Sequence, residues 1–123
     1  MPDRIAATAV ADDATADRRP AWSWAAFCGG ILGANSCPHL LVAARRGHML
    51  TPLGGKDSGP AANLIWGLMN VTAASVAVLS AVRSADQPSR LTWPFALGSA
   101  TFGAWAVIYE TISSKRGGAH NDG

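Results

Sequence analysis

The sequence predicts an all-α integral membrane protein in which three transmembrane helices pack as a small antiparallel bundle. Charged residues make up 15% of the chain, against roughly 25% in an ordinary soluble domain. None of them occurs in residues 20–44, 58–82 or 91–109. Each window is close to the ~20 helical residues that cross a hydrocarbon core about 30 Å thick. A soluble helix is usually shorter and keeps a charged face, so these windows indicate lipid as the surrounding medium.

Polar tails flank the transmembrane domain, which is expected to occupy residues 21–112. Residues 1–20 are rich in Ala and Asp and contain few large apolar residues, so a disordered N-terminal tail is expected. Its acidic residues precede any apolar run, unlike the pattern of a cleavable secretory signal. Residues 113–123 are polar and glycine-containing, and a disordered C-terminal tail is expected there.

The first span, residues 21–44, contains Pro38. Proline removes the hydrogen bond to the carbonyl of Ala34 and predicts a kink. Alternatively, Asn35 or Ser36 caps a second segment that begins near Pro38. The first helix is therefore expected to be kinked or broken near Asn35–Pro38.

Residues 45–60 carry four glycines and two prolines without periodicity, which predicts a loop. The second span follows over residues 61–82 and the third over residues 91–112. Because the link at residues 83–90 is short, these two spans are expected to be antiparallel neighbours.

Three spans place the termini on opposite sides of the membrane. We call the side of the N-terminus the N-terminal side, and the side of the 45–60 loop and the C-terminus the loop side. Basic residues near the two sides are almost balanced, so the positive-inside rule gives no orientation. On the N-terminal side they are Arg18, Arg19, Arg83 and Arg90, and on the loop side Arg45, Arg46, Lys56, Lys115 and Arg116.

Small and polar residues gather on one face of each span, and such faces mediate helix packing in membranes. In the second span this face comprises Asn63, Gly67, Asn70, Ala74, Ala77 and Ala81. In the third span it comprises Thr92, Ala96, Ser99, Gly103, Ala106 and Glu110. Gly29 and Gly33 form a GxxxG step in the first span. We therefore expect Gly29, Gly33, Gly67 and Gly103 to contribute to helix packing.

Two amides are predicted to meet near mid-membrane. Asn35 and Asn70 both lie ~14 Å from the loop side when their helices run antiparallel. A hydrogen bond between them would satisfy groups that lipid cannot, at an average of about 0.6 kcal/mol.

A polar cluster is predicted nearer the loop side. His39, Asn63 and Glu110 lie close to that end of their spans, and Arg46 follows just outside. Ionisable groups inside a membrane indicate a functional site. A structural ion pair with Arg46, or side chains reaching to the interface, is the alternative, and the sequence leaves both open.

No catalytic, cofactor or metal motif is present, so neither an enzyme nor a cofactor is expected. Gly54-Gly55-Lys56 resembles a phosphate-binding loop superficially, but Leu50 occupies the position of the required upstream glycine. The net charge of +2 is too small to indicate nucleic-acid binding.

The expected function is that of a non-enzymatic membrane component that associates with itself or with a larger membrane complex. The alternative is a small oligomeric transporter, or a protein that handles protons or cations through Glu110 and His39. Besides the lipid bilayer, a homo-oligomer or larger complex is the expected partner. Arg far outnumbers Lys and Ala is abundant, which is typical of GC-rich bacterial genomes, so a multi-pass protein of a bacterial inner membrane is expected.

Overall fold

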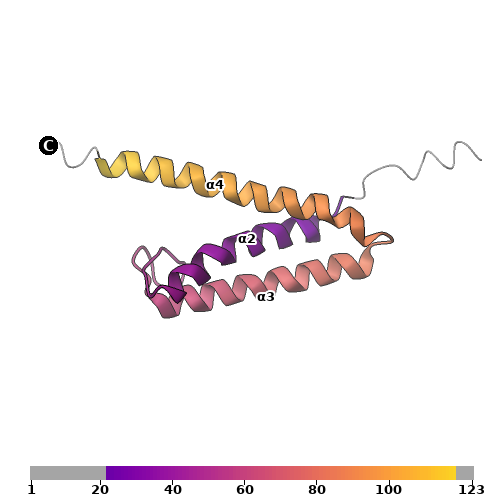
Figure 1. Ribbon diagram of the computed structural model, residues 1–123, viewed down its shortest axis with the longest axis horizontal. Coiled ribbons are helices and arrows are strands. Elements are labelled where there is room, and N and C mark those ends of the chain that lie inside the picture. Colours follow the sequence, from indigo (N-terminus) through magenta and orange to yellow (C-terminus); the bar gives the residue numbers. More distant parts are fainter. Residues whose placement is uncertain (1–21, 119–123) are drawn as a thin grey trace, which may run out of the picture.

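The computed structural model describes residues 22–118, which form three long helices and one short one (Figure 1). The long helices are α2 (Trp24–Ala44), α3 (Pro60–Ser84) and α4 (Thr92–Gly118), and the 3₁₀ helix η1 (Pro88–Leu91) precedes α4. All three long helices are long and apolar enough to cross a membrane. The predicted all-α fold with three spanning helices is confirmed.

Helix α2 is one continuous helix that contains Pro38, so it is not broken into two segments. Its start is capped by Ser23, whose hydroxyl accepts a 3.2 Å hydrogen bond from the amide of Ala26. Next to the proline, the Ser36 hydroxyl donates to the Gly33 carbonyl at 2.6 Å. Arg46 follows the end of α2 with a φ of 56°, and the Gly47 amide then donates back to the Val42 carbonyl at 2.9 Å.

Helix α4 ends later than predicted. The third span was expected to end at residue 112, but the helix continues through residues 113–118, part of the stretch expected to be a disordered tail. Residues 1–20 and 119–123, which hold the rest of the predicted tails, lie outside the described residues. Helix α3 differs from its predicted bounds only slightly, with Pro60 in its first turn.

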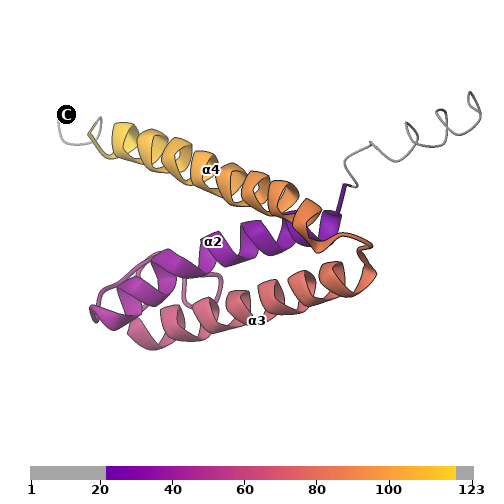
Figure 2. The same cartoon turned by 45° about the vertical axis from the view of Figure 1, so that its right-hand side comes forward.

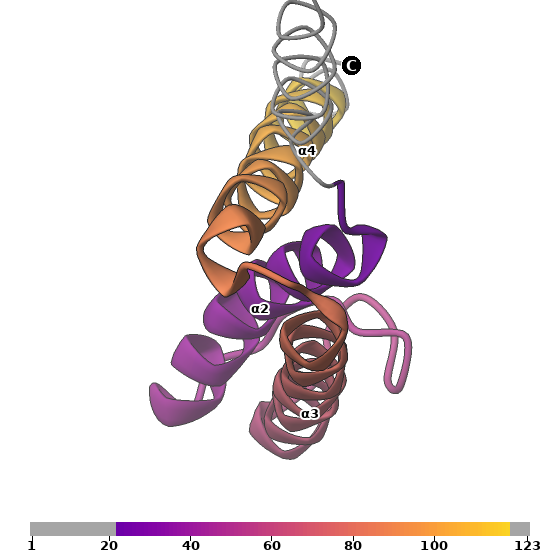
Figure 3. The same cartoon turned by 90° about the vertical axis from the view of Figure 1, so that its right-hand side faces the viewer.

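Helix α2 lies between the other two. It packs against α3, which runs antiparallel to it, and against α4, which runs in the same direction (Figures 1 and 2). Helices α3 and α4 have little direct contact with each other. The expectation that the second and third spans are neighbours is therefore wrong. The view along the helices shows α3 and α4 on different sides of α2 (Figure 3), because η1 and its flanking turns carry the chain past α2.

Small residues bring α2 and α3 together. A Cβ at Gly29 would lie 2.8 Å from Val78 Cγ2, and one at Gly67 would lie 2.7 Å from Leu40 Cδ2. The α3 face identified from the sequence is the buried face, with Asn63, Gly67, Asn70, Ala74 and Ala81 all buried. At Gly33 a Cβ would meet its nearest neighbours at an ordinary 3.9 Å, so this glycine lies at the contact without being required by it.

A second pair of glycines brings α2 and α4 together. A Cβ at Gly30 would overlap the Phe95 carbonyl, and a Cβ at Gly98 would overlap the Phe27 carbonyl. The Ser99 hydroxyl donates to the Gly30 carbonyl across this crossing at 3.2 Å. The helix backbones touch here.

Gly103 contacts no other helix within the described bundle, contrary to the expectation that it contributes to packing there. It is exposed, and a Cβ there would meet nothing within 4 Å. The reason is that α4 diverges from α2 beyond the crossing (Figure 2), so a small face one turn further along has no helix opposite it.

The distribution of side chains fits lipid surroundings. The only buried hydrophobic residues in the described part are Ala26, Ala74 and Ala81, while large apolar side chains such as Leu68 and Ile108 are more than half exposed. Asn63 and Asn70, in contrast, are buried. Polar groups inside and large apolar groups outside are what a bilayer favours, because lipid cannot satisfy an amide.

Candidate functional site

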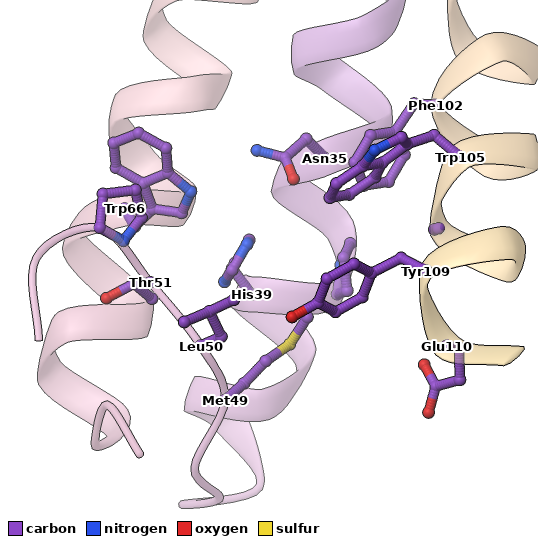
Figure 4. Close-up of a pocket in the computed structure, with 13 residues that line it drawn as sticks. Asn35, His39, Met49, Leu50, Thr51, Trp66, Phe102, Trp105, Tyr109 and Glu110 are labelled. Carbon is purple, nitrogen blue, oxygen red and sulfur yellow. The ribbon is translucent and has the colours of Figure 1, made fainter. Parts of the chain in front are cut away.

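A cavity of about 620 Å³ lies on the loop side, between α2, α4 and the loop. It is lined by Asn35, Pro38, His39, Met49, Leu50, Thr51, Pro52, Trp66, Phe102, Trp105, Ala106, Tyr109 and Glu110. Figure 4 shows side chains from all three long helices and from the loop around it. Its volume lies within the range of about 300–1,000 Å³ that is usual for small-molecule sites. The cavity exists because α4 leaves α2 beyond the Gly30–Gly98 crossing.

The loop between α2 and α3 forms one wall of this cavity and has a defined structure. Thr51 and Gly55 exchange two backbone hydrogen bonds, of 3.1 and 2.9 Å. The Thr51 hydroxyl donates to the Ser58 hydroxyl at 2.8 Å, which in turn donates to the Gly55 carbonyl at 2.8 Å. Thr51 and Ser58 are 1% and 3% exposed. Neither residue was expected from the sequence, although a Thr-Pro pair followed by Gly-Gly is a signal for a tight turn.

Asn63 ties the loop to α3. It is fully buried, and its side-chain NH₂ donates to the carbonyls of Ser58 at 2.7 Å, Gly59 at 3.1 Å and Met49 at 3.3 Å. These three carbonyls lie at the two ends of the loop. One side chain therefore closes it.

Asn63 also orients His39. The two side chains meet at 2.9 Å, between His39 Nδ1 and Asn63 Oδ1. Because the Asn63 NH₂ is engaged by carbonyls, its oxygen must face the ring, so His39 Nδ1 carries the hydrogen and donates it. In the neutral ring the lone pair is then on Nε2.

His39 Nε2 is left for a partner in the cavity. No described side chain forms a hydrogen bond with Nε2. Because no fully buried side-chain polar atom in the described residues lacks a hydrogen-bond partner, Nε2 is not fully buried. His39 is only 4% exposed and it lines the cavity. The small surface that it presents therefore includes Nε2, an acceptor whose orientation Asn63 sets.

Three aromatic residues of α4 line the opposite wall. Trp105 and Tyr109 are stacked, with ring centroids 5.5 Å apart and an interplanar angle of 20°. Phe102 continues the series at 5.9 Å from Trp105. Trp66 faces them from α3, and the Tyr109 ring reaches toward His39 and Leu50 (Figure 4).

Glu110 is the only formally charged residue among those that line the cavity. It is exposed and lies at the edge of the cavity on the loop side (Figure 4). Among the described side chains, it forms no ion pair or hydrogen bond with His39 or Arg46.

Arg46 does not join the predicted cluster. It is exposed and does not line the cavity. The left-handed backbone at residue 46 ends α2, so its side chain does not continue the helical face that carries His39. Of the four residues predicted to gather, the structure joins His39 to Asn63, places Glu110 at the same cavity as His39, and leaves Arg46 outside.

The mid-membrane amides lie where the sequence placed them. Asn35 Nδ2 donates to Asn70 Oδ1 at 3.1 Å, and Asn70 Nδ2 donates to the Trp66 carbonyl at 2.8 Å. Asn35 also lines the end of the cavity that lies deepest in the membrane. The pair therefore links α2 to α3 at that end of the cavity.

A metal centre has no support among the described residues, where no group of three or more His, Cys, Asp or Glu side chains could hold an ion. Cys28 and Cys37 are both exposed and free. They lie on a helix surface that faces lipid in a membrane.

Comparison with protein-family models, with curated proteins and with solved structures finds no match to this chain. The three long apolar helices fit a small multi-pass membrane protein. Its activity must be argued from the cavity.

Proposed function

We propose that this protein is a non-enzymatic membrane component that takes an amphipathic molecule from the bilayer into the cavity between α2, α4 and the loop. One observation carries the proposal: the α4 wall of the cavity changes from apolar to polar toward the loop side. Phe102 and Trp105 lie deeper, whereas Tyr109 and Glu110 lie nearer the loop side. Phe102 and Glu110 are eight residues apart on α4, which is a rise of ~12 Å.

Such a gradient matches a molecule with an apolar tail and a polar head. The tail would contact Phe102, Trp105 and Pro38, while the head would lie near Tyr109, His39 and Glu110. Trp105 is 58% and Tyr109 48% exposed, and in a membrane that exposure is toward lipid. A ligand can therefore enter sideways without crossing the loop.

The polar groups of the cavity favour binding over catalysis. The Thr51 hydroxyl, which would be the natural nucleophile, is engaged with Ser58. His39 forms no hydrogen bond with a hydroxyl or with Glu110, so no nucleophile is paired with a base. The cavity instead provides a binding space with one hydrogen-bond acceptor, His39 Nε2, and one carboxylate, that of Glu110.

Photolabelling tests the proposal. A fatty alcohol with a diazirine in its tail, incorporated in bilayers with the protein, is expected to label the residues that the tail would contact, Phe102, Trp105 and Pro38. Ala106→Phe fills the cavity and should abolish this labelling. Ala104→Phe adds the same ring to an exposed position of α4 that does not line the cavity, and should leave the labelling intact.

Two results would contradict the proposal. One is labelling spread evenly over the exposed faces of all three helices. The other is equal labelling of the cavity residues in the Ala106→Phe and Ala104→Phe proteins when both remain folded in detergent.

Self-association through α4 is a second candidate function. The supporting observation is that Gly103 is exposed with open space around it, since small residues allow helices to approach closely. The occupant would be the same helix of a second copy. In a Cys28→Ala, Cys37→Ala background, Gly103→Cys is expected to form a disulfide-linked dimer in native membranes, while Val76→Cys on the exposed face of α3 is not. A monomer at every oxidant dose would remove this candidate.

Cation transport is the alternative that the same cavity supports, because His39 and Glu110 both line it. Its test is flux into proteoliposomes, which Glu110→Gln should abolish. Unchanged flux in this variant would dismiss a role for the carboxylate.

A further inference from the structure

We infer that the head of the bound amphiphile is a primary ammonium group. The inference rests on the proposed function and names the ligand class of the same cavity. It combines three properties of the lining: its charge, its aromatic faces and its hydrogen-bonding groups.

The charge of the lining selects against anions. Glu110 is the only charged residue that lines the cavity, and no Lys or Arg is among the lining residues. Arg45, Arg46 and Lys56 are exposed on the same side of the membrane. An anionic lipid head is therefore attracted more strongly to these exposed cations than to the cavity. A cationic head is attracted to the Glu110 carboxylate.

The aromatic faces add to this preference. Trp105 and Tyr109 are stacked nearly parallel. Both line the cavity; Tyr109 directly precedes Glu110 in the sequence, and Trp105 lies about one turn earlier on α4. The face of an indole or phenol ring attracts a cation within about 6 Å of its centre, more strongly where water is excluded. A cation beside Glu110 therefore lies near the phenol ring of Tyr109 (Figure 4).

The hydrogen-bonding groups distinguish a primary ammonium from a quaternary one. His39 Nε2 is an acceptor, because Asn63 holds the hydrogen of the ring on Nδ1. The Glu110 carboxylate is also an acceptor. A primary ammonium carries three donors and no acceptor, so it can donate a hydrogen bond to either group, whereas a trimethylammonium head has no donor.

Native mass spectrometry of the full chain in a neutral maltoside detergent tests the inference. Four probes share one tail: dodecylamine, dodecyltrimethylammonium, dodecanol and dodecanoate. We expect dodecylamine to bind most tightly, followed by the trimethylammonium compound, the alcohol and the carboxylate. Because the ligands vary and the protein does not, the role of His39 is tested without disturbing its bond to Asn63.

A variant isolates the carboxylate. Glu110→Gln should weaken dodecylamine binding about tenfold, the loss of a free energy of ~1.4 kcal/mol, and should leave dodecanol binding unchanged. The matched control is Asp86→Asn, which removes one exposed carboxylate at the opposite end of the bundle and should change neither affinity.

The outcomes separate the inference from the proposed function. If all four probes bind equally, or dodecanoate binds best, the ammonium assignment is overturned while amphiphile binding stands. Equal binding of the two cations overturns the assignment of His39. An unchanged dodecylamine affinity in Glu110→Gln overturns the role of the carboxylate. If no probe binds, the proposed function fails as well.

Discussion

The α2–α3 pair and the α2–α4 pair are held together in different ways. The first contact extends along both helices and combines small residues with buried amides, from Gly29 near the N-terminal side to Asn63 on the loop side. The second is concentrated at the Gly30–Gly98 crossing. Beyond it the helices diverge and the cavity begins. The α2–α3 pair therefore supplies a rigid frame, whereas the α2–α4 pair leaves an opening whose position is set by two glycines.

The largest expected effect follows from breaking the crossing. Gly30→Ala places a Cβ against the backbone of α4, where no side chain can move aside, and should lower the free energy of unfolding by about 3 kcal/mol. Reversible unfolding in mixed micelles measures this. Gly103→Ala is the matched control, because open space surrounds that residue. It should be neutral or stabilise the helix by up to about 1 kcal/mol.

The Gly30→Ala substitution should affect the two helix contacts differently. In the Gly30→Ala protein, hydrogen exchange should accelerate in α4, while the loop and the facing sides of α2 and α3 stay protected. Uniform acceleration along the whole chain would show that the frame depends on α4.

The next largest effect comes from the frame itself. Asn63→Ala leaves the Met49 carbonyl and His39 Nδ1 without their partner, while the Ser58 carbonyl keeps only the Met49 amide, and should destabilise the protein by about 2 kcal/mol. The loop should become sensitive to protease, and α4 should keep its contact at Gly30. A loop as resistant as that of the unchanged protein would contradict the account of its closure.

A smaller effect is expected at the end of α2. Arg46 has a φ of 56°, which disfavours any residue with a Cβ. Arg46→Gly should therefore stabilise the protein by about 0.5–1 kcal/mol. Thermal unfolding in detergent measures the change. Loss of stability would mean that the Arg46 side chain contributes more at the interface than its backbone strain removes.

The smallest expected effect is at mid-membrane. Asn70→Leu removes the hydrogen bond to Asn35 and should lower stability by about 0.6 kcal/mol. Unfolding in mixed micelles again provides the measurement, with Val71→Leu on the neighbouring exposed position as the control. A loss as large as that of Gly30→Ala would indicate that the amide pair, and not the crossing, dominates packing.

The sequence was informative wherever depth in the membrane decided the outcome. Uncharged windows located the three helices, and equal distance from one side brought Asn35 to Asn70. The same reasoning brought His39 and Asn63 together. Each of these inferences needs only the rise per residue and the position of the helix ends.

The sequence was not informative where the direction of a helix decided the outcome. A helical wheel identifies a small-residue face but not the helix that meets it, so Gly103 was chosen for packing and Gly30 and Gly98 were overlooked. Arg46 was placed with His39 because the left-handed turn that ends α2 cannot be read from helical spacing. The Thr51–Ser58 contact depends on a loop conformation that no periodic pattern encodes.

Two distances between spin labels test the central claim, that α4 contacts α2 at one crossing and leaves it toward the loop side. In lipid nanodiscs, with Cys37 replaced by alanine, one pair would label Cys28 and Leu97→Cys beside the crossing. The other, with Cys28 also replaced, would label Leu41→Cys and Ile108→Cys near the loop side. The account predicts a clearly longer separation for the second pair. Equal separations would mean that α4 follows α2 along its whole length, and would contradict both the crossing and the cavity.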